Sequence, residues 1–201
     1  MLILRSSPAS PFGRKVKIAA AVLGLSKRIE MKQADTNDPA DSLRQQNPLG
    51  KIPALILENG ETVYDSAVIV DYLDWLAGGG KIIPAMGPAR FGVLTRQALA
   101  DGIAEAAVLQ IYEARMREPQ HHSAKWLDLQ AGKVARGLAA AEAGLDRFTV
   151  HDIGGIALAC ALGYLDLRFA GGWRASHPKL AAWLGAFERA TPSFDETRVK
   201  A

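Results

Sequence analysis

The pattern of hydrophobic and polar positions divides the chain into a mixed first part and a helical second part. A short apolar run at residues 2–4 predicts a strand. Apolar positions at helical spacing over residues 12–23 predict a helix that Gly24 ends. Residues 28–34 alternate apolar and polar side chains and predict a second strand. The chain therefore opens with a strand–helix–strand unit.

A short helix, a hairpin and a longer helix are predicted next. Residues 38–48 lie between prolines and predict the short helix, and Asn59-Gly60 within residues 53–65 is a strong hairpin signal. Residues 66–77 return to helical period. This order predicts a small sheet with parallel and hairpin pairing, covered by helices.

Beyond this point the strand signals stop. Residues 78–88 begin with three consecutive glycines and contain two prolines, which is typical of a linker. Long helical patterns follow over residues 89–117, 123–148 and 152–168, and another begins after His177-Pro178. The second part is therefore predicted to be an all-α helical bundle.

The predicted domain boundaries follow from these patterns. A chain of 201 residues is long enough for one large or two small domains. We expect an α/β domain at 1–78, a linker at 79–88 and an all-helical domain at 89–201.

Composition and charge narrow the class of protein. Hydrophobic residues make up 49% and charged residues 22%, which is ordinary for a soluble globular chain. The net charge of +3 is spread among acidic residues without a run of like charge, so no nucleic-acid partner is predicted. The single cysteine, Cys160, cannot form an internal disulfide and lies in an apolar helical stretch, which favours structural packing. With no apparent signal or membrane-spanning segment, we expect a cytoplasmic protein that does not bind membranes.

The first candidate chemistry is the stretch "SPASPFGRKVKIA" at residues 7–19. Ser10 before Pro11 is a good helix start, because serine caps the helix and proline suits its first position. If Ser10 is only a helix cap, it needs no other role. The same helix start also presents free N–H groups and a positive dipole end, which stabilise an anion such as a thiolate.

The second stretch is "NPLGKIPAL" at residues 47–55. Pro53 interrupts the predicted start of a strand, so it lies at an edge or follows a cis bond. A cis bond would leave the backbone of Ile52 exposed, free to pair with an extended peptide-like ligand.

The third stretch is "YDSAVIVDYL" at residues 64–73. Ser66 is expected to cap the following helix, and its hydroxyl with the first free N–H groups would form a carboxylate site. Asp65 offers a negative charge suited to an ammonium group. Asp65 and Ser66 together could bind the ammonium and carboxylate groups of an α-amino acid. The alternative is that Ser66 is only a helix cap and Asp65 is a solvated acid.

Taken together, the three stretches resemble motifs of the glutathione S-transferase family, in the family's order and spacing. The resemblance covers nearly the whole chain and implies a thioredoxin-like N-terminal domain and an all-helical C-terminal domain. "TVHDIGGIALACAL" at residues 149–162 adds a fourth motif, the family's capping box, with Thr149 as cap and Asp152 reaching back. Its implied role is in folding.

The resemblance implies specific roles for residues of this chain. Ser10 aligns with the serine that contacts the glutathione sulfur in serine-type classes. Asp65 and Ser66 would hold the γ-glutamyl group, and Asp101 could reach its ammonium or help at a subunit interface. Members are typically homodimers. The full implied glutathione-binding set is Ser10, Phe12, Lys51, Ile52, Pro53, Asp65 and Ser66.

An apolar co-substrate pocket is expected beside Ser10. Its implied lining is Pro8, Ala9, Phe12, Ile103, Ala107 and Tyr112, with ordinary interdomain packing as the alternative for each residue. No metal is predicted, because His121 and His122 are adjacent and would point to different sides of a helix.

The implied activity is conjugation of glutathione to small electrophiles, with a role in detoxification. A thiol with a pKa of about 8.5 is mostly protonated at neutral pH, and Ser10 would donate a hydrogen bond that stabilises the thiolate. No cysteine lies near Ser10 and no Cys-x-x-Cys occurs, which disfavours enzymes with their own thiol. The alternatives are a glutathione-dependent peroxidase or disulfide reductase, and a non-catalytic module that binds glutathione or a protein.

Overall fold

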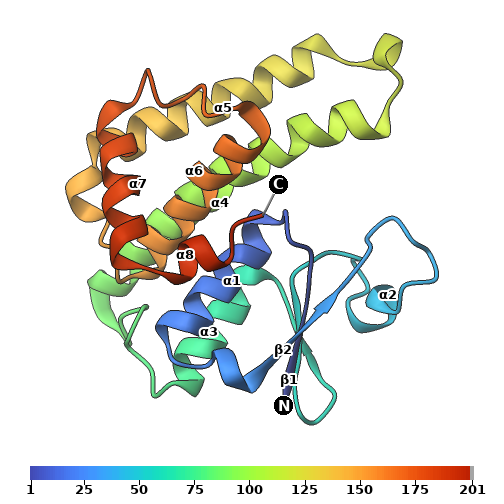
Figure 1. The fold of residues 1–201 in the computed structure, drawn as a ribbon, viewed down its shortest axis with the longest axis vertical. Helices are drawn as coiled ribbons and strands as arrows, with labels where there is room; N and C mark the ends of the chain where they lie inside the picture. Colours follow the sequence, from blue (N-terminus) through green and yellow to red (C-terminus); the bar gives the residue numbers. More distant parts are fainter. Residues whose placement is uncertain (200–201) are drawn as a thin grey trace.

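A four-stranded sheet organises the first part of the chain in the computed structural model, which describes residues 1–199 (Figure 1). The strands are β1 (Leu2–Ser6), β2 (Ile29–Gln33), β3 (Ala54–Ile56) and β4 (Thr62–Val63). Their order is β2-β1-β3-β4, with β1 parallel to β2 and antiparallel to β3, and β3 antiparallel to β4. Both the parallel pair and the predicted hairpin are therefore present.

Helices cover the two faces of this sheet. Leu55 of β3 packs in the main hydrophobic core with α1 and α3, whereas its neighbour Ala54 contacts Leu43 of α2 in a small separate cluster. Adjacent strand residues point to opposite faces, so α2 covers the face away from α1 and α3 (Figure 1). The helices of this part are α1 (Pro11–Val22), η1 (Ser26–Arg28), α2 (Leu43–Gln46) and α3 (Ser66–Leu76).

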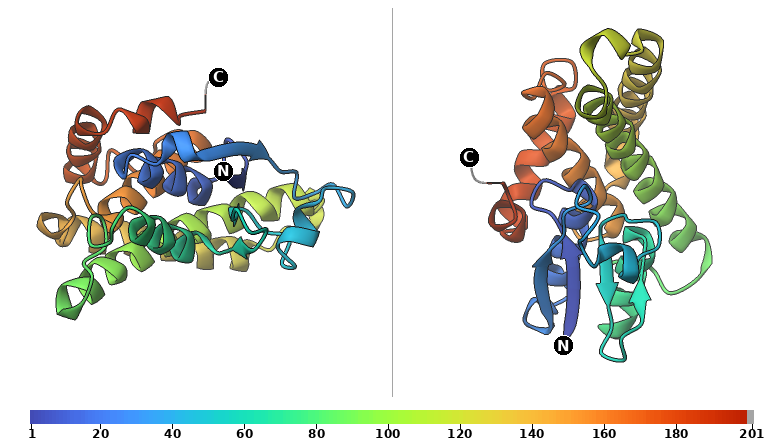
Figure 2. Two further views of the ribbon diagram at one scale, coloured as in Figure 1. Left: turned by 90° about the horizontal axis from the view of Figure 1, so that it is seen from below. Right: turned by 90° about the vertical axis from the view of Figure 1, so that its right-hand side faces the viewer.

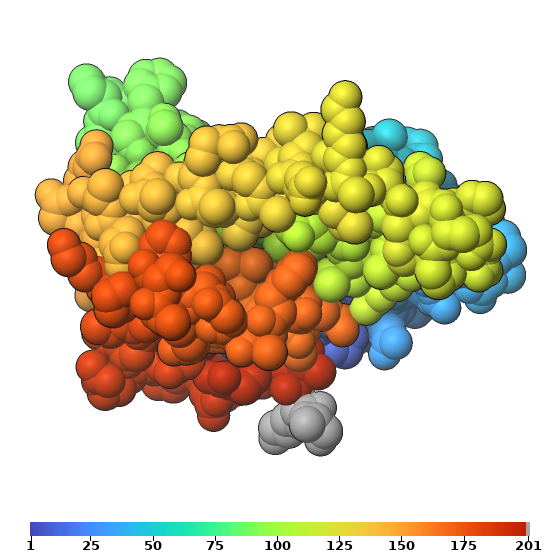
Figure 3. Space-filling model, turned by 90° about the horizontal axis from the view of Figure 1, so that it is seen from above, coloured from blue at the N-terminus to red at the C-terminus, as the bar shows by residue number. Residues whose placement is uncertain are grey.

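The second part is entirely helical in the described residues. Helix α6 is buried on nearly every side, which fits its near-continuous apolar sequence, and it contacts α1, α4 and α7. From above, the second part covers almost the whole face and the first part emerges at one side (Figure 3). Its helices are α4 (Gly87–Met116), η2 (Pro119–His121), α5 (Ala124–Ala143), η3 (Leu145–Arg147), α6 (Ile153–Phe169), α7 (Pro178–Ala190) and α8 (Ser193–Glu196).

Hydrogen bonds fix the backbone of the stretch predicted as a linker. The buried Asp74 carboxylate accepts the backbone N–H groups of Gly80, Lys81 and Ile82 at 2.8, 3.0 and 2.9 Å. The Ile82 carbonyl in turn accepts the N–H of Ile153 at the start of α6. The sheet with its helices lies beside the bundle (Figure 2), and one hydrophobic core contains residues of both parts. The precise domain boundaries stay a prediction.

The predicted sequence of elements is confirmed, with two differences. The cap of α6 is Asp152, whose side chain accepts the N–H of Gly155, while the Thr149 hydroxyl accepts the N–H of Asp152. The predicted cap at Thr149 is therefore wrong by three residues, because Thr149 closes the turn before the helix. The short helix α8 carries no amphipathic period and was not predicted. Within residues 1–199, no helix has the length and apolarity to cross a membrane.

Candidate functional site

Ser10 is the last residue of the loop between β1 and α1. It has extended backbone angles, and its Oγ accepts the N–H of Gly13 at 3.1 Å, as an N-cap serine does. Gly13 is required here, because a Cβ would lie 2.0 Å from the Ser6 Oγ. The first turn of α1 holds no acidic residue, so no carboxylate of that turn occupies the positive end of the helix.

A cavity of about 200 Å³ opens beside Ser10. Pro8 and Ala9 of the loop before α1 line one side, and Gly163 and Tyr164 of α6 line another. The cavity therefore lies between the first part of the chain and the bundle. Arg14, Cys160, Asp166, Leu167, Arg198 and Val199 complete its wall together with Pro11.

Ile52 is half-buried, but its backbone N–H and C=O are without partners in the described part of the chain. The Ile52–Pro53 peptide bond is cis, and no residue among 1–199 hydrogen-bonds to the Ile52 N–H or C=O. The buried Asn47 donates from Nδ2 to the carbonyl of Lys51 at 2.9 Å, which fixes the segment before it. Lys51 itself is exposed. An extended ligand thus has one backbone donor and one acceptor available at Ile52.

Asp65, and not Ser66, caps α3. The Asp65 Oδ1 accepts the N–H of Ala67 at 3.0 Å, so the predicted cap at Ser66 is wrong by one residue. The carboxylate preceding the helix is the better-placed acceptor, and Ser66 becomes the first helical residue. Asp65 is exposed, and its Oδ2 makes no hydrogen bond within residues 1–199.

Sheet topology brings these three positions to one edge. Strands β1 and β4 run in the same direction and β3 runs in the opposite one. Ser10 follows β1, Asp65 follows β4, and Ile52 precedes β3, so all three lie at the same end of the sheet. The register Arg5–Ala54 places the segment that leads to Ser10 next to Ile52.

The residues predicted for the co-substrate pocket do not all lie at the cavity, and the pocket itself stays a prediction. Pro8 and Ala9 line the cavity, but Ile103 and Ala107 are buried in the core. A Cβ on Gly137 would lie 2.5 Å from Ile103, which shows that Ile103 packs against α5. Apolar residues look alike in a sequence whether they line a cavity or fill a core. Phe12 is half-buried against the core and Tyr112 is exposed outside the cavity wall.

Asp101 has a partner within the chain. Its two carboxylate oxygens lie 2.8 and 2.6 Å from the Nζ of Lys15, which is 1% exposed. This ion pair ties α4 to α1. The predicted role of Asp101 at a glutamyl ammonium or an interface stays a prediction.

Sequence reasoning missed the polar part of the cavity wall. Arg14, Tyr164 and Arg198 come from α1, α6 and the C-terminal tail. Arg14 follows Ser10 by four residues, and this spacing on a helix is the one signal that could have found it.

Cys160 is inert by position. It is 2% exposed on α6, and burial raises the pKa of its thiol to about 12. Structural packing, as predicted, is confirmed. In the described part of the chain, no three His, Cys, Asp or Glu side chains gather as metal ligands.

Several known proteins are similar to this chain. A family model described as "Glutathione S-transferase, N-terminal domain" matches residues 4–81. The uncharacterized GST-like protein YibF of Escherichia coli K12 is 32% identical over 182 residues, covering 88% of this chain and 89% of YibF. A glutathione transferase family member from Pseudomonas fluorescens Pf-5, solved with bound glutathione, is 44% identical. Each chain covers 100% of the other, with a TM-score of 0.94.

A second structure of a Pseudomonas fluorescens Pf-5 family member contains S-(propanoic acid)-glutathione. It is also 44% identical, covers 100% of both chains and has a TM-score of 0.89. These matches extend from the sheet through the bundle, so the thioredoxin-like first part and the helical second part are both confirmed. The chain belongs to the glutathione S-transferase family.

Proposed function

We propose that this protein is a glutathione transferase in which Ser10 stabilises the thiolate of glutathione. The observation that carries the proposal is the position of Ser10. Ser10 lies at the positive end of a 12-residue helix and lines a cavity, at the sheet edge shared with Ile52 and Asp65. Relatives solved with glutathione or a glutathione conjugate support the ligand.

The tripeptide would lie along this edge. Its backbone pairs with Ile52 before Pro53, with Lys51 beside it. The γ-glutamyl ammonium meets the free Oδ2 of Asp65, and its carboxylate meets the Ser66 hydroxyl and the first N–H groups of α3. Phe12 packs beneath the cysteinyl part, and the sulfur ends beside Ser10.

Chemistry at the sulfur requires the thiolate. The glutathione thiol loses its proton to solvent, and the Ser10 O–H donates to the sulfur anion. A charge-assisted hydrogen bond of about 1.5–3 kcal/mol lowers the thiol pKa by about one to two units. The sulfur electron pair then forms a bond to an electrophilic carbon. Either a leaving group departs with its electron pair, or the electrons of a double bond move to the next carbon, which takes a proton from water.

Substitutions at Ser10 separate its two roles, which are capping and hydrogen-bond donation. Ser10→Ala removes both, whereas Ser10→Asp keeps a capping acceptor but cannot donate to sulfur when ionised. Ser10→Thr retains both. The measurement is the pH titration of bound glutathione by its ultraviolet thiolate absorbance.

We expect the bound thiol pKa to lie below the free value in the wild type and Ser10→Thr, and to rise by about one unit or more in Ser10→Ala and Ser10→Asp. Ser7→Ala, in the same loop, is the control and should leave the pKa unchanged. Absence of glutathione binding would refute any glutathione-dependent function. Binding with an unshifted thiol pKa would indicate a non-catalytic module, and turnover of hydroperoxides or disulfides alone would indicate the reductase alternative.

The expected homodimer has a candidate contact surface on α3 and α4. Val68 and Trp75 lie seven residues apart on one face of α3 and are 52% and 68% exposed. Asp71 between them is 2.6 Å from Arg90 of α4, which precedes the exposed Phe91, so exposed apolar side chains of both helices flank one ion pair. Sedimentation should give a dimer that Trp75→Glu converts to monomers. Cytoplasmic location and a role in detoxification stay predictions.

A further inference from the structure

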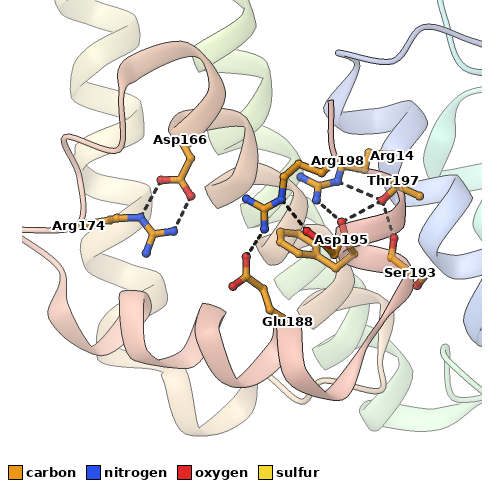
Figure 4. A network of polar contacts seen from close by, with 9 residues as sticks. Arg14, Asp166, Arg174, Glu188, Ser193, Asp195, Thr197 and Arg198 are labelled. Carbon is orange, nitrogen blue, oxygen red and sulfur yellow. Dashed lines mark hydrogen bonds and ion pairs between the residues drawn. The ribbon is translucent and has the colours of Figure 1, made fainter. Parts of the chain in front are cut away.

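Arg14 is a buried cation that faces the cavity. Its side chain is 8% exposed, and it follows Ser10 by one helical turn on the same face of α1. Its guanidinium donates from Nη2 to the carbonyl of Phe194 and from Nε to the Thr197 hydroxyl, and it stacks 3.8 Å from the Phe194 ring (Figure 4). These contacts hold the group in one place.

No carboxylate in the described part of the chain touches Arg14. Glu188 and Asp195 act on its charge only from a distance, and both are bound by Arg198. Among residues 1–199, no Asp or Glu forms an ion pair with it, and its Nη1 makes no hydrogen bond. This Nη1 lies against Gly163 in the cavity wall, where a Cβ would be 2.5 Å away. A buried guanidinium keeps its charge, and a charge without a partner is costly in a protein interior. A ligand anion in the cavity would supply the missing partner.

The other charges around the cavity favour an anion as well. The carboxylate of Asp166 accepts two hydrogen bonds from Arg174, at 2.9 and 2.6 Å (Figure 4). It also accepts the indole N–H of Trp173. Arg198 binds Glu188 and Asp195 through Nη2 and Nε, which leaves its Nη1 without a hydrogen bond in the described part of the chain. Two guanidinium groups of the wall, those of Arg14 and Arg198, therefore each have an Nη1 without a hydrogen bond within residues 1–199.

We propose that the cavity selects small electrophiles that carry a carboxylate, with Arg14 as the residue that binds it. This inference rests on the proposed function, since it assigns the substrate class of the same site. Ser10 and Arg14 lie about one helical turn apart, a rise of about 6 Å along the axis, and both line the cavity. The cavity of about 200 Å³ has the volume of about seven water molecules, which admits such a group.

An α,β-unsaturated carboxylate meets these requirements. The thiolate sulfur bonds to the carbon farther from the carboxylate, and the double-bond electrons move to the carbon beside it. That carbon takes a proton from water, which replaces the proton that the thiol released. The product is an S-(2-carboxyethyl) conjugate when the acid has three carbons, and no oxidant or reductant is needed.

A matched pair of conjugates tests the charge directly. S-(2-Carboxyethyl)glutathione and S-(2-carbamoylethyl)glutathione have nearly the same shape, and only the first is an anion at its S-substituent. Calorimetric titration of the wild-type protein should show about tenfold or greater preference for the carboxylate. Glutathione itself is titrated in parallel, so that loss of the proposed function is recognised separately.

Variants assign the preference to Arg14. In Arg14→Gln the preference should fall to about twofold or less, while glutathione affinity stays within about twofold of the wild type. Arg14→Lys should retain most of the preference because it retains the charge. Thr197→Val removes one anchor of the guanidinium without removing the charge, and it should keep the preference.

Two results would overturn the inference while leaving the proposed function intact. One is equal affinity of the wild-type protein for the two conjugates. The other is an unchanged preference in Arg14→Gln, which would indicate that Arg198 rather than Arg14 binds the ligand carboxylate. Should Arg14→Gln fail to fold, the wild-type and Arg14→Lys titrations still decide the matter, because the retained charge should keep most of the preference in Arg14→Lys. Loss of the preference in Arg14→Lys would contradict the assignment to the charge at this position. Failure of glutathione to bind would remove both proposals.

Discussion

The two sides of the candidate site are built in different ways. The side proposed to bind glutathione, called the glutathione side below, consists of Ser10, Ile52 and Asp65. Each lies at the start or end of a strand or helix close by in sequence. The cavity side joins α1 to α6 and to the C-terminal tail, and the Arg14–Phe194 hydrogen bond spans 180 positions. Local chain chemistry therefore positions one side, and tertiary packing positions the other.

This difference has a chemical counterpart. The glutathione side offers backbone groups and helix ends, which suit a ligand that is the same in every reaction. The cavity side offers side chains of α6 and the tail, which can be exchanged without disturbing the sheet edge. A protein built this way can keep one substrate while changing the other.

The largest effect is expected at the junction of the two regions. Asp74→Ala would leave three backbone N–H groups without their carboxylate, and one of them, that of Ile82, is buried. We expect the free energy of unfolding to fall by about 3–5 kcal/mol, measured by urea denaturation. A single transition should persist, because one hydrophobic core spans both regions.

Asp71→Ala on the same helix is the matched control. Asp71 is 46% exposed in its ion pair with Arg90, so its loss should cost no more than about 1 kcal/mol. Equal losses in the two variants would contradict the structural role of Asp74. Two separate transitions would show that the sheet region and the helical bundle unfold independently.

The sequence predicted the local features and missed the distant ones. Ser10-Pro11 and Asn59-Gly60 determine their own backbone geometry, so a cap and a hairpin can be recognised within a few residues. Even there, single positions shift, because Asp65 rather than Ser66 reaches the free N–H of α3. Asp152 likewise displaces Thr149 as the cap of α6.

The cavity wall could not be predicted for a physical reason. Ile103 and Ala107 have the composition of a pocket lining, and only packing against α5 and α6 shows that they are core. In the sequence, Arg14 has the position of an ordinary surface arginine on an amphipathic helix. In the structure, α8 and the C-terminal tail cover it. Burial of this kind depends on contacts that no local pattern encodes.

A smaller effect is expected when only the cavity side is altered. In Gly163→Ala the new methyl group would lie 2.5 Å from the Arg14 Nη1 and 3.2 Å from Phe194, so the guanidinium must shift. We expect affinity for S-(2-carboxyethyl)glutathione to fall by about threefold to tenfold, with glutathione affinity unchanged, in calorimetric titrations.

Gly102→Ala supplies the control for this substitution. Gly102 lies in α4 with nothing within 4 Å of its added Cβ, so alanine there should leave both affinities unchanged. Equal weakening of glutathione and conjugate by Gly163→Ala would show that the two sides are coupled. Unchanged binding of both would show that the Arg14 side chain can move without consequence.

The smallest effect is expected at the thiol of the cavity side. Cys160 lines the cavity, yet burial raises its pKa to about 12, so only about one thiol in ten thousand is ionised at pH 8. Since the thiolate is the reactive form, iodoacetamide should alkylate free glutathione faster as the pH rises from 6 to 8, while Cys160 in the folded protein stays unmodified by mass spectrometry. In urea the thiol should regain ordinary reactivity, which provides the positive control. Alkylation of the folded protein at pH 7 would mean that the bundle opens readily around α6, and α6 would then not be a fixed part of the cavity wall.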